Sequence, residues 1–248
     1  MRKNKYLTKL IFIFTLFAYT IMMVGCWDRK EIEDLGLIVC VAIDRPETTK
    51  GKEQEEKEEK LAHDVRKAKH RLTVTQQFVV PKAMGGKEST SMSNEKAYSN
   101  IGSEGDTLFQ VVRQFYTTSS RIPYYRHLKV IIIGEEIARA LNMEKLMNFF
   151  LRDPEVSRDI NMMIAKGSAR DVLEIKPIKE QLPTLALLSL TKNASRTARM
   201  APKLMLGDMS KKMASNESFI VPRVIGYGNR VQLAGAAVVH GKTNKMLG

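Results

Sequence analysis

Apolar and polar residues alternate along the chain in blocks that predict the strands of a β-sheet. Continuous apolar runs at residues 35–43 and 128–133 are short and rich in Val and Ile, which is typical of strands buried on both faces. The run at residues 72–80 alternates imperfectly and stops at Pro81, so we expect a strand with one less buried face. Further strands are expected at residues 159–165, 219–222 and 231–240.

Helical periodicity separates these strands. Asp106 or Thr107 can cap a helix whose apolar residues recur with i, i+3, i+4, i+7 spacing as far as Phe115. Ser168 with Asp171 three positions later matches a capping box at the start of another helix. Other helices are expected at residues 135–141, 143–151, 185–190 and 204–213. This order predicts an α+β fold with a mixed β-sheet covered by helices.

The first 25 residues follow a different pattern. Residues 1–9 carry four cations and no acid, and residues 10–24 form an uncharged apolar run. A span of the bilayer needs about 20 apolar residues, so the pattern predicts a signal peptide at residues 1–25. Small residues before Cys26 fit the end of a lipoprotein signal, so Cys26 is predicted to carry lipid. The alternative is an uncleaved N-terminal anchor, and both place the rest outside the cytoplasm.

Composition divides the remaining chain into two expected domains. An N-terminal α+β domain is expected at residues 26–215, with an exposed insertion rich in Lys and Glu at about 48–70. Residues 216–248 are expected to begin a second α+β domain. Residues 241–247 have the composition of a turn and a returning strand. Because the sequence stops inside this hairpin, we expect a C-terminally truncated product or a fragment of a longer chain.

Charge and cysteine content narrow the possible partners and cofactors. The formal charge falls from +13 to +9 when the four cations of residues 1–25 are removed. This excess fits anionic lipid headgroups better than nucleic acid, since no basic stripe with interleaved aromatic residues is present. Cys40 lies in an apolar run and is predicted to be a buried small hydrophobic residue. The four histidines have no metal-ligand spacing, so we expect no metal and no cofactor.

No enzyme motif is found, so the sequence predicts a protein without catalytic residues. Residues 83–100 are expected to form a loop. The glycine-containing residues 102–107 could hold an anion on exposed N–H groups, but a glycine turn of the kind that routinely precedes a helix explains them better. Glu135 and Glu136 are better explained as acids complementing a helix dipole than as a catalytic pair. His127 beside a buried strand is predicted to be a hydrogen-bonded structural histidine.

Three stretches of the chain resemble one known family. They are residues 25–35, with the run Cys26-Trp27-Asp28-Arg29, residues 126–138 and residues 233–239. These segments are similar to the Ger(x)C family of spore germination lipoproteins, and the Cys-Trp-Asp-Arg run is the most specific of them. The chain departs from the family at Cys40, where a small residue is common, in the length of the Lys/Glu insertion, and in lacking most of the C-terminal region.

The resemblance implies a C subunit of a nutrient germinant receptor. Such a subunit would be anchored through lipid on Cys26 to the outer face of the spore inner membrane. It would assemble with a polytopic A subunit and a permease-like B subunit, and would serve receptor assembly or transmission of the nutrient signal. The alternative is a solute-binding lipoprotein of a transporter, which would hold a ligand between two complete α/β lobes.

Overall fold

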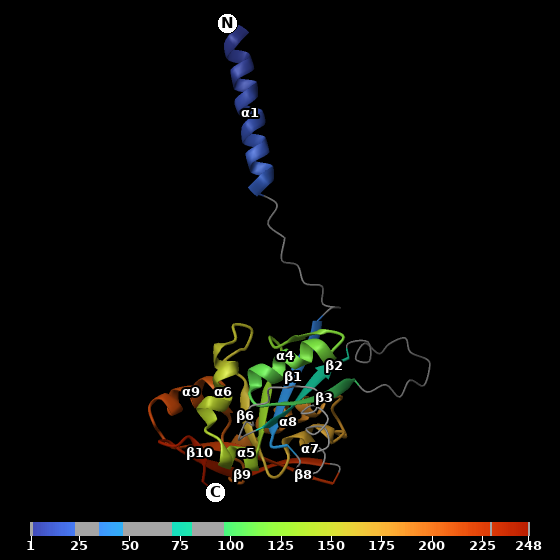
Figure 1. Cartoon of the computed structure of the whole chain (residues 1–248), viewed down its shortest axis with the longest axis vertical. Helices are drawn as coiled ribbons and strands as arrows, with labels where there is room; N and C mark the ends of the chain where they lie inside the picture. Colours follow the sequence, from blue (N-terminus) through green and yellow to red (C-terminus); the bar gives the residue numbers. More distant parts are fainter. Residues whose placement is uncertain (1, 23–34, 47–70, 81–96, 229, 248) are drawn as a thin grey trace, which may run out of the picture. The chain divides into compact units, whose positions relative to one another are not determined.

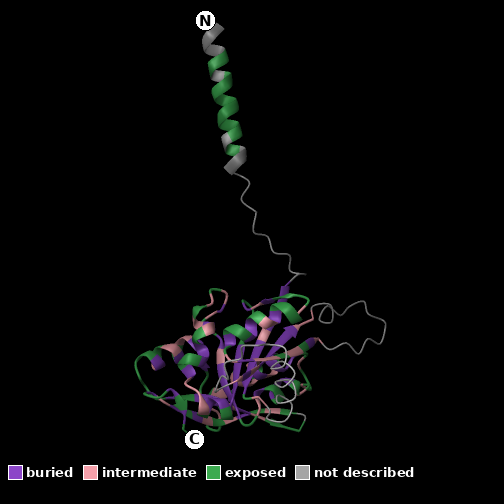
Figure 2. Cartoon of the chain, viewed as in Figure 1, coloured by how far each residue is buried: buried purple, intermediate pink, exposed green. Residues whose placement is uncertain are grey.

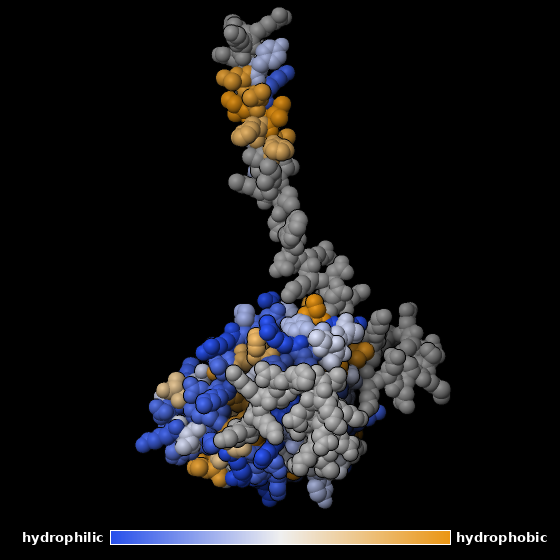
Figure 3. All heavy atoms as spheres, in the orientation of Figure 1, coloured by the Kyte–Doolittle hydropathy of each residue, from blue (hydrophilic) through white to orange (hydrophobic). Residues whose placement is uncertain are grey.

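The computed structural model describes residues 2–22, 35–46, 71–80, 97–228 and 230–247. The chain divides into two compact units, Met1–Leu35 and Gly36–Gly248. The first unit contains helix α1 (Arg2–Met22), along which apolar side chains gather (Figure 3). Its exposed apolar residues include Phe12, Phe14 and Phe17. Within the described ranges, none of the helices is both long enough and apolar enough to span a bilayer.

The second unit is built on a ten-stranded mixed sheet with the order β10-β9-β8-β6-β5-β1-β2-β3, while β4 pairs with β1 and β7 with β6 (Figure 1). The strands are β1 (Leu35–Asp44), β2 (Leu72–Val79), β3 (Tyr98–Gly105), β4 (Ile122–Tyr124), β5 (Val130–Gly134), β6 (Asn161–Ala165), β7 (Leu204–Met205), β8 (Phe219–Tyr227), β9 (Arg230–His240) and β10 (Lys245–Met246). Four central strands, β1, β5, β6 and β8, run parallel to one another. Antiparallel pairs flank them, β2 with β3 on one side and β9 with β10 on the other.

Helices cover both faces of the parallel strands. They are α4 (Leu108–Thr118), α5 (Glu135–Ala140), α6 (Met143–Arg152), α7 (Ala169–Glu174), α8 (Pro183–Thr191) and α9 (Leu206–Ala214), with a short 3-10 turn η2 (Ala194–Arg196). Buried residues of α4, α5, α6 and α9 pack with Val41 and Ile131 in one core. Buried residues of α7 and α8 pack with Ala42 and Ile132 in a second core on the other face. Alternate residues of β1, β5 and β6 therefore enter different cores, which explains the continuous apolar runs of β1 and β5. Figure 2 shows these strands as buried.

The predicted α+β fold with a mixed sheet covered by helices is confirmed. The strand expected at residues 35–43 is β1, and the one expected at residues 128–133 is β5. Thr107 caps α4 as predicted, since its hydroxyl accepts a hydrogen bond from the backbone N–H of Gln110 at 3.2 Å.

Residues 98–105 differ from the prediction of a loop followed by a glycine turn. They form β3, which pairs with β2 along its whole length, from Tyr98 opposite Val79 to Gly105 opposite Leu72. The sequence of β3 lacks apolar alternation because several of its side chains are not buried. Pairing with a neighbouring strand outweighs its weak intrinsic strand preference. The backbone of residues 102–105 pairs with β2 instead of forming a free turn before α4.

The capping box predicted for α7 is also wrong. The side chain of Ser168 makes no capping hydrogen bond to the helix. Instead the carboxylate of Asp44, at the end of β1, accepts hydrogen bonds from the backbone N–H groups of Ala169 at 2.7 Å and Arg170 at 2.8 Å. The helix is thus capped by a residue more than a hundred positions away, which local sequence cannot reveal.

Strands β8, β9 and β10 extend the sheet of the preceding residues. β8 pairs with β6 through Ile164 opposite Arg223 and Ala165 opposite Val224. The hairpin expected at residues 241–247 is present, with Lys245 opposite His240. The division into one domain at residues 26–215 and the start of another at residues 216–248 stays a prediction.

Candidate functional site

An open groove of about 600 Å³ lies between α9 and the beginning of β8. Its apolar part includes the nearly buried side chains of Leu204 and Phe219, together with Ile220, which is 43% exposed. Charged and hydroxyl side chains complete the lining: Lys203, Asp208, Lys211, Lys212, Ser215, Glu217 and Ser218. The groove therefore combines an apolar surface with charges of both signs.

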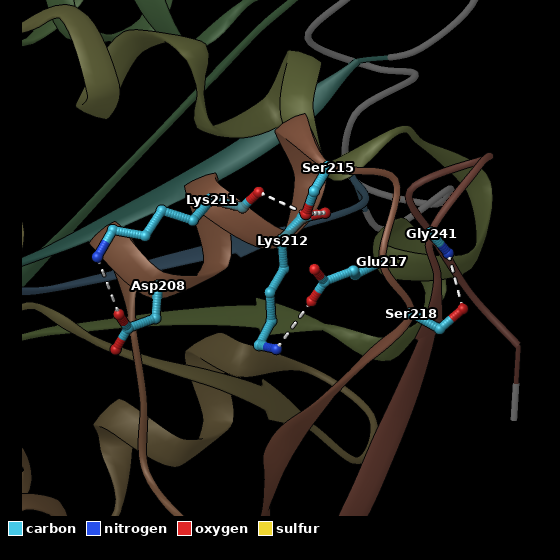
Figure 4. Close-up of polar contacts among 7 residues, drawn as sticks. All are labelled: Asp208, Lys211, Lys212, Ser215, Glu217, Ser218 and Gly241. Atoms are coloured by element: carbon cyan, nitrogen blue, oxygen red, sulfur yellow. Dashed lines mark hydrogen bonds and ion pairs between the residues drawn. The ribbon is translucent and has the colours of Figure 1, made fainter.

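Two ion pairs lie along the groove (Figure 4). The Nζ atom of Lys211 is 3.8 Å from Asp208 Oδ1, and Nζ of Lys212 is 3.4 Å from Glu217 Oε2. All four side chains are at least 40% exposed. Exposed ion pairs contribute only about 0–1 kcal/mol, so each partner can exchange its contact for a charged group of a bound molecule. Lys203 forms no ion pair with any residue that the structure describes.

Tight backbone contacts position the segment after α9. The hydroxyl of Ser218 accepts a hydrogen bond from the backbone N–H of Gly241 at 3.1 Å (Figure 4). A Cβ atom at Gly241 would overlap the carbonyl group of Asn216, so only glycine permits this approach. Asn216 itself has a φ of 56°, the left-handed conformation that Asn tolerates better than most residues. The turn at Asn216 and its contacts with Gly241 therefore fix the position of Glu217 and Ser218, which line the groove.

The groove is suited to binding a partner with both apolar and charged groups. Its lysines can pair with carboxylates, its acids with cations, and its apolar part can bury a side chain. Sequence analysis missed it, because Asp208 and Lys211 predict only an i, i+3 pair on one helix. Their approach to residues 217–220 depends on the turn that follows α9, in which the backbone N–H of Glu217 donates to the carbonyl of Lys212. No group of three His, Cys, Asp or Glu side chains able to hold a metal is found among the described residues.

A second polar cluster lies where the parallel strands end. Burial raises the pKa of the Asp44 carboxyl, while hydrogen bonds from the backbone of Ala169 and Arg170 act in the opposite direction. Gly134, the last residue of β5, lies directly against this carboxylate, and a Cβ atom there would overlap Asp44 Oδ1. The cluster joins β1, β5 and α7 and is filled by its own contacts, which indicates a structural role.

Glu135 binds two arginines at the same edge of the sheet. Its carboxylate accepts hydrogen bonds from Arg139 at 2.7 Å and from Arg223 at 3.1 Å. The hydrogen bond from Arg139 is the main reason that the pKa of Glu135 lies below its usual value. Both Glu135 and Glu136 lie in the first turn of α5. This is the position expected for acids that complement the helix dipole.

The other residues singled out from the sequence have different outcomes. Cys26, the predicted lipidation site, lies outside the described residues. Cys40 is fully buried, as expected, and burial raises the pKa of its thiol to about 12. His127 is exposed and makes an edge-on ring contact with Tyr124 at 5.9 Å. The described part of the chain gives His127 no hydrogen bond, so the prediction of a hydrogen-bonded structural histidine is wrong.

Comparison with known families matches residues 28–225 to the family described as Spore germination protein N-terminal domain. The match covers most of the chain, including the whole parallel part of the sheet. The chain belongs to this family of spore germination proteins, which confirms the resemblance to Ger(x)C proteins found in the sequence.

Three relatives from Bacillus subtilis (strain 168) illustrate the similarity. Spore germination protein YndF is 34% identical over 232 residues, which is 92% of this chain and 56% of YndF. Spore germination protein A3 is 26% identical over 93% of this chain and 55% of A3. Spore germination protein B3 is 27% identical over 94% of this chain and 56% of B3. The chain thus spans about half the length of the curated relatives it matches.

A crystal structure of the GerBC protein is also similar to this chain. It has 22% sequence identity, a TM-score of 0.38, and coverage of 75% of this chain and 50% of the GerBC chain.

Proposed function

We propose that the chain acts in spore germination as a non-catalytic, lipid-anchored C subunit of a nutrient germinant receptor. The observation that supports this proposal is the family match over residues 28–225. The match begins two positions after Cys26, so the family domain directly follows the predicted lipidation site. Its work is receptor assembly or transmission of the nutrient signal, and no side chain is assigned to nutrient contact.

The proposed partners are membrane lipid, through Cys26, and the integral membrane A and B subunits of the receptor. The proposed location is the outer face of the spore inner membrane. The groove between α9 and β8 is a candidate contact for one of these subunits, because its apolar and charged lining suits a protein surface better than a single ion.

The anchor is tested by metabolic labelling with a radiolabelled fatty acid. We expect label on the wild-type chain and none on Cys26→Ala. Cys40→Ala is the matched control, because it removes the other cysteine, which is buried in β1, and should leave the label unchanged. Equal labelling of wild type and Cys26→Ala would overturn the anchor assignment.

The receptor role is tested in spores. Deletion of the gene should abolish the response to at least one nutrient while leaving germination by a nutrient-independent stimulus intact. The tagged chain, extracted from spore membranes, should copurify with two integral membrane proteins. An unchanged response to every nutrient tested, together with no membrane partner, would contradict the proposal.

A further inference from the structure

The segment at residues 107–134 contains four cations and no acid. The cations are Arg113, Arg121, Arg126 and Lys129, and the nearest acids along the chain are Asp106 and Glu135. In a chain that is 27% charged, 28 consecutive residues without Asp or Glu are a marked local bias. The segment includes α4, β4 and β5.

Part of this segment surrounds the place where β1 begins. β4 pairs with β1, and the carbonyl oxygen of Ile122 lies 3.4 Å from the point where a Cβ atom would stand if Gly36 were replaced. The backbone N–H of Lys129 donates to the carbonyl of Val39 at 2.9 Å. We call the exposed side chains at this edge the β1 rim. They are Tyr116, Arg121, Ile122, Arg126 and Lys129.

The β1 rim combines unpaired cations with exposed apolar surface. Arg121 and Arg126 form no ion pair with any residue that the structure describes. Tyr116 is 55% exposed and Ile122 46% exposed. Lys129 interacts electrostatically with Asp159 on the loop after α6, and the same loop brings Asp153 and Glu155 near Tyr125. Arg121 and Arg126 are therefore the rim cations that stand outside any ion pair of the described residues.

The length of chain between Cys26 and β1 limits how far the rim can lie from a membrane. Cys26 stands nine positions before Leu35, the first residue of β1. A fully extended chain covers at most about 3.3–3.6 Å per residue, so these positions span at most roughly 30 Å. If Cys26 carries lipid, as in the proposed function on which this step rests, the beginning of β1 stays within that distance of the headgroups.

We propose that the β1 rim contacts the anionic headgroups of the membrane in which the chain is anchored. Lys and Arg near an anionic leaflet are each attracted by about 1 kcal/mol. Tyr is favoured at the boundary between headgroups and acyl chains, because its ring is apolar and its hydroxyl is polar. The contact fixes the orientation of the domain, with the carboxyl ends of the parallel strands directed away from the lipid.

The test measures backbone hydrogen exchange of the full chain, purified from membranes as the cell makes it. The chain is reconstituted into vesicles of phosphatidylcholine alone or of phosphatidylcholine with phosphatidylglycerol. On the anionic vesicles, amides of residues 117–129 should exchange more slowly, by up to about 30-fold if two arginines contribute about 1 kcal/mol each. High salt should remove the difference, because it screens exposed charges.

Charge reversal provides the matched comparison. Arg121→Glu with Arg126→Glu should abolish the difference between the two lipids. Lys192→Glu with Arg196→Glu changes the net charge equally at other exposed positions and should preserve it. Equal exchange on both lipids, or slowing that needs a second membrane protein, overturns the proposal. Flotation of the chain with the vesicles reports the anchor separately, so a floating chain with lipid-independent exchange overturns only the rim contact.

Discussion

At the scale of single residues, the informative positions are polar groups buried at the ends of apolar strands. Asp44 is 8% exposed and joins β1 to the beginning of α7 through two backbone N–H groups. The sequence predicts that Asp44 terminates a strand, but not that it caps a helix. Its partners lie far along the chain, so only the assembled sheet brings them together.

Replacing Asp44 with Asn should lower the free energy of unfolding. One of the two N–H groups would face an amide donor instead of an acceptor, which costs about 1–3 kcal/mol when the group is buried. Urea unfolding of the purified protein measures this loss. Glu144→Gln, at an exposed carboxyl in the first turn of α6, is the control and should change stability little.

The same pair of proteins should differ in pH dependence. Burial raises the pKa of Asp44 in the folded protein, so the folded state holds its proton at a higher pH than the unfolded state does. The stability contributed by this proton is fully present below the ordinary Asp pKa of about 3.9 and is lost as pH rises through the raised pKa. The stability advantage of wild type over Asp44→Asn should therefore shrink from pH 4 upward. Parallel pH profiles would contradict the burial of this carboxyl.

At the scale of elements, a chain of hydrogen bonds joins α8 to the sheet. The hydroxyl of Thr184 donates to Gln77 Oε1 at 2.5 Å, and Gln77 Nε2 donates to Asn100 Oδ1 at 3.0 Å. Asn100 Nδ2 then donates to the carbonyl of Leu173 in α7 at 2.9 Å. This series of hydrogen bonds crosses β2 and β3. It therefore links α7 and α8, the helices of the second core, to the antiparallel side of the sheet.

Thr184→Val should destabilise the protein although it conserves shape. The substitution leaves the buried oxygen of Gln77 without its donor, at a cost of about 1–3 kcal/mol in the free energy of unfolding. Thr191→Val is the matched control on the same helix, since its hydroxyl donates only to Leu188 within α8. Chemical unfolding of both variants separates a general effect of valine in α8 from loss of the link. Equal stability of the two would show that the link contributes nothing.

The elements that could be predicted are those that bury apolar side chains with a regular period. β1 and β5 were identified by continuous apolar runs, because both of their faces enter a core. β3 could not be predicted, because its residues are polar and small and its position depends on pairing with β2. The groove was missed because its charges come from α9 and the segments on either side of it, and only the turn after α9 brings them beside Phe219 and Ile220 of β8.

At the scale of the whole molecule, the two cysteines report on different parts of the chain. Cys40 belongs to β1, one of the four central strands, where burial raises the pKa of its thiol to about 12. A thiol in this environment is protonated and shielded, so it reacts with reagents only after unfolding. Cys26 precedes the family domain and, in the proposed function, has its sulfur occupied by lipid.

The number of reactive thiols therefore tests fold and anchor together. The native protein, extracted in mild detergent, should form no maleimide adduct at neutral pH, and unfolding in urea should reveal one, at Cys40. Mass spectrometry of the digested protein identifies the labelled residue, and Cys40→Ala should give no adduct in either state. A native adduct at Cys26 would show an unmodified thiol and contradict lipidation. A native adduct at Cys40 would instead contradict the placement of β1 between the two cores, because a strand covered by helices on both faces leaves a reagent no access to its side chains.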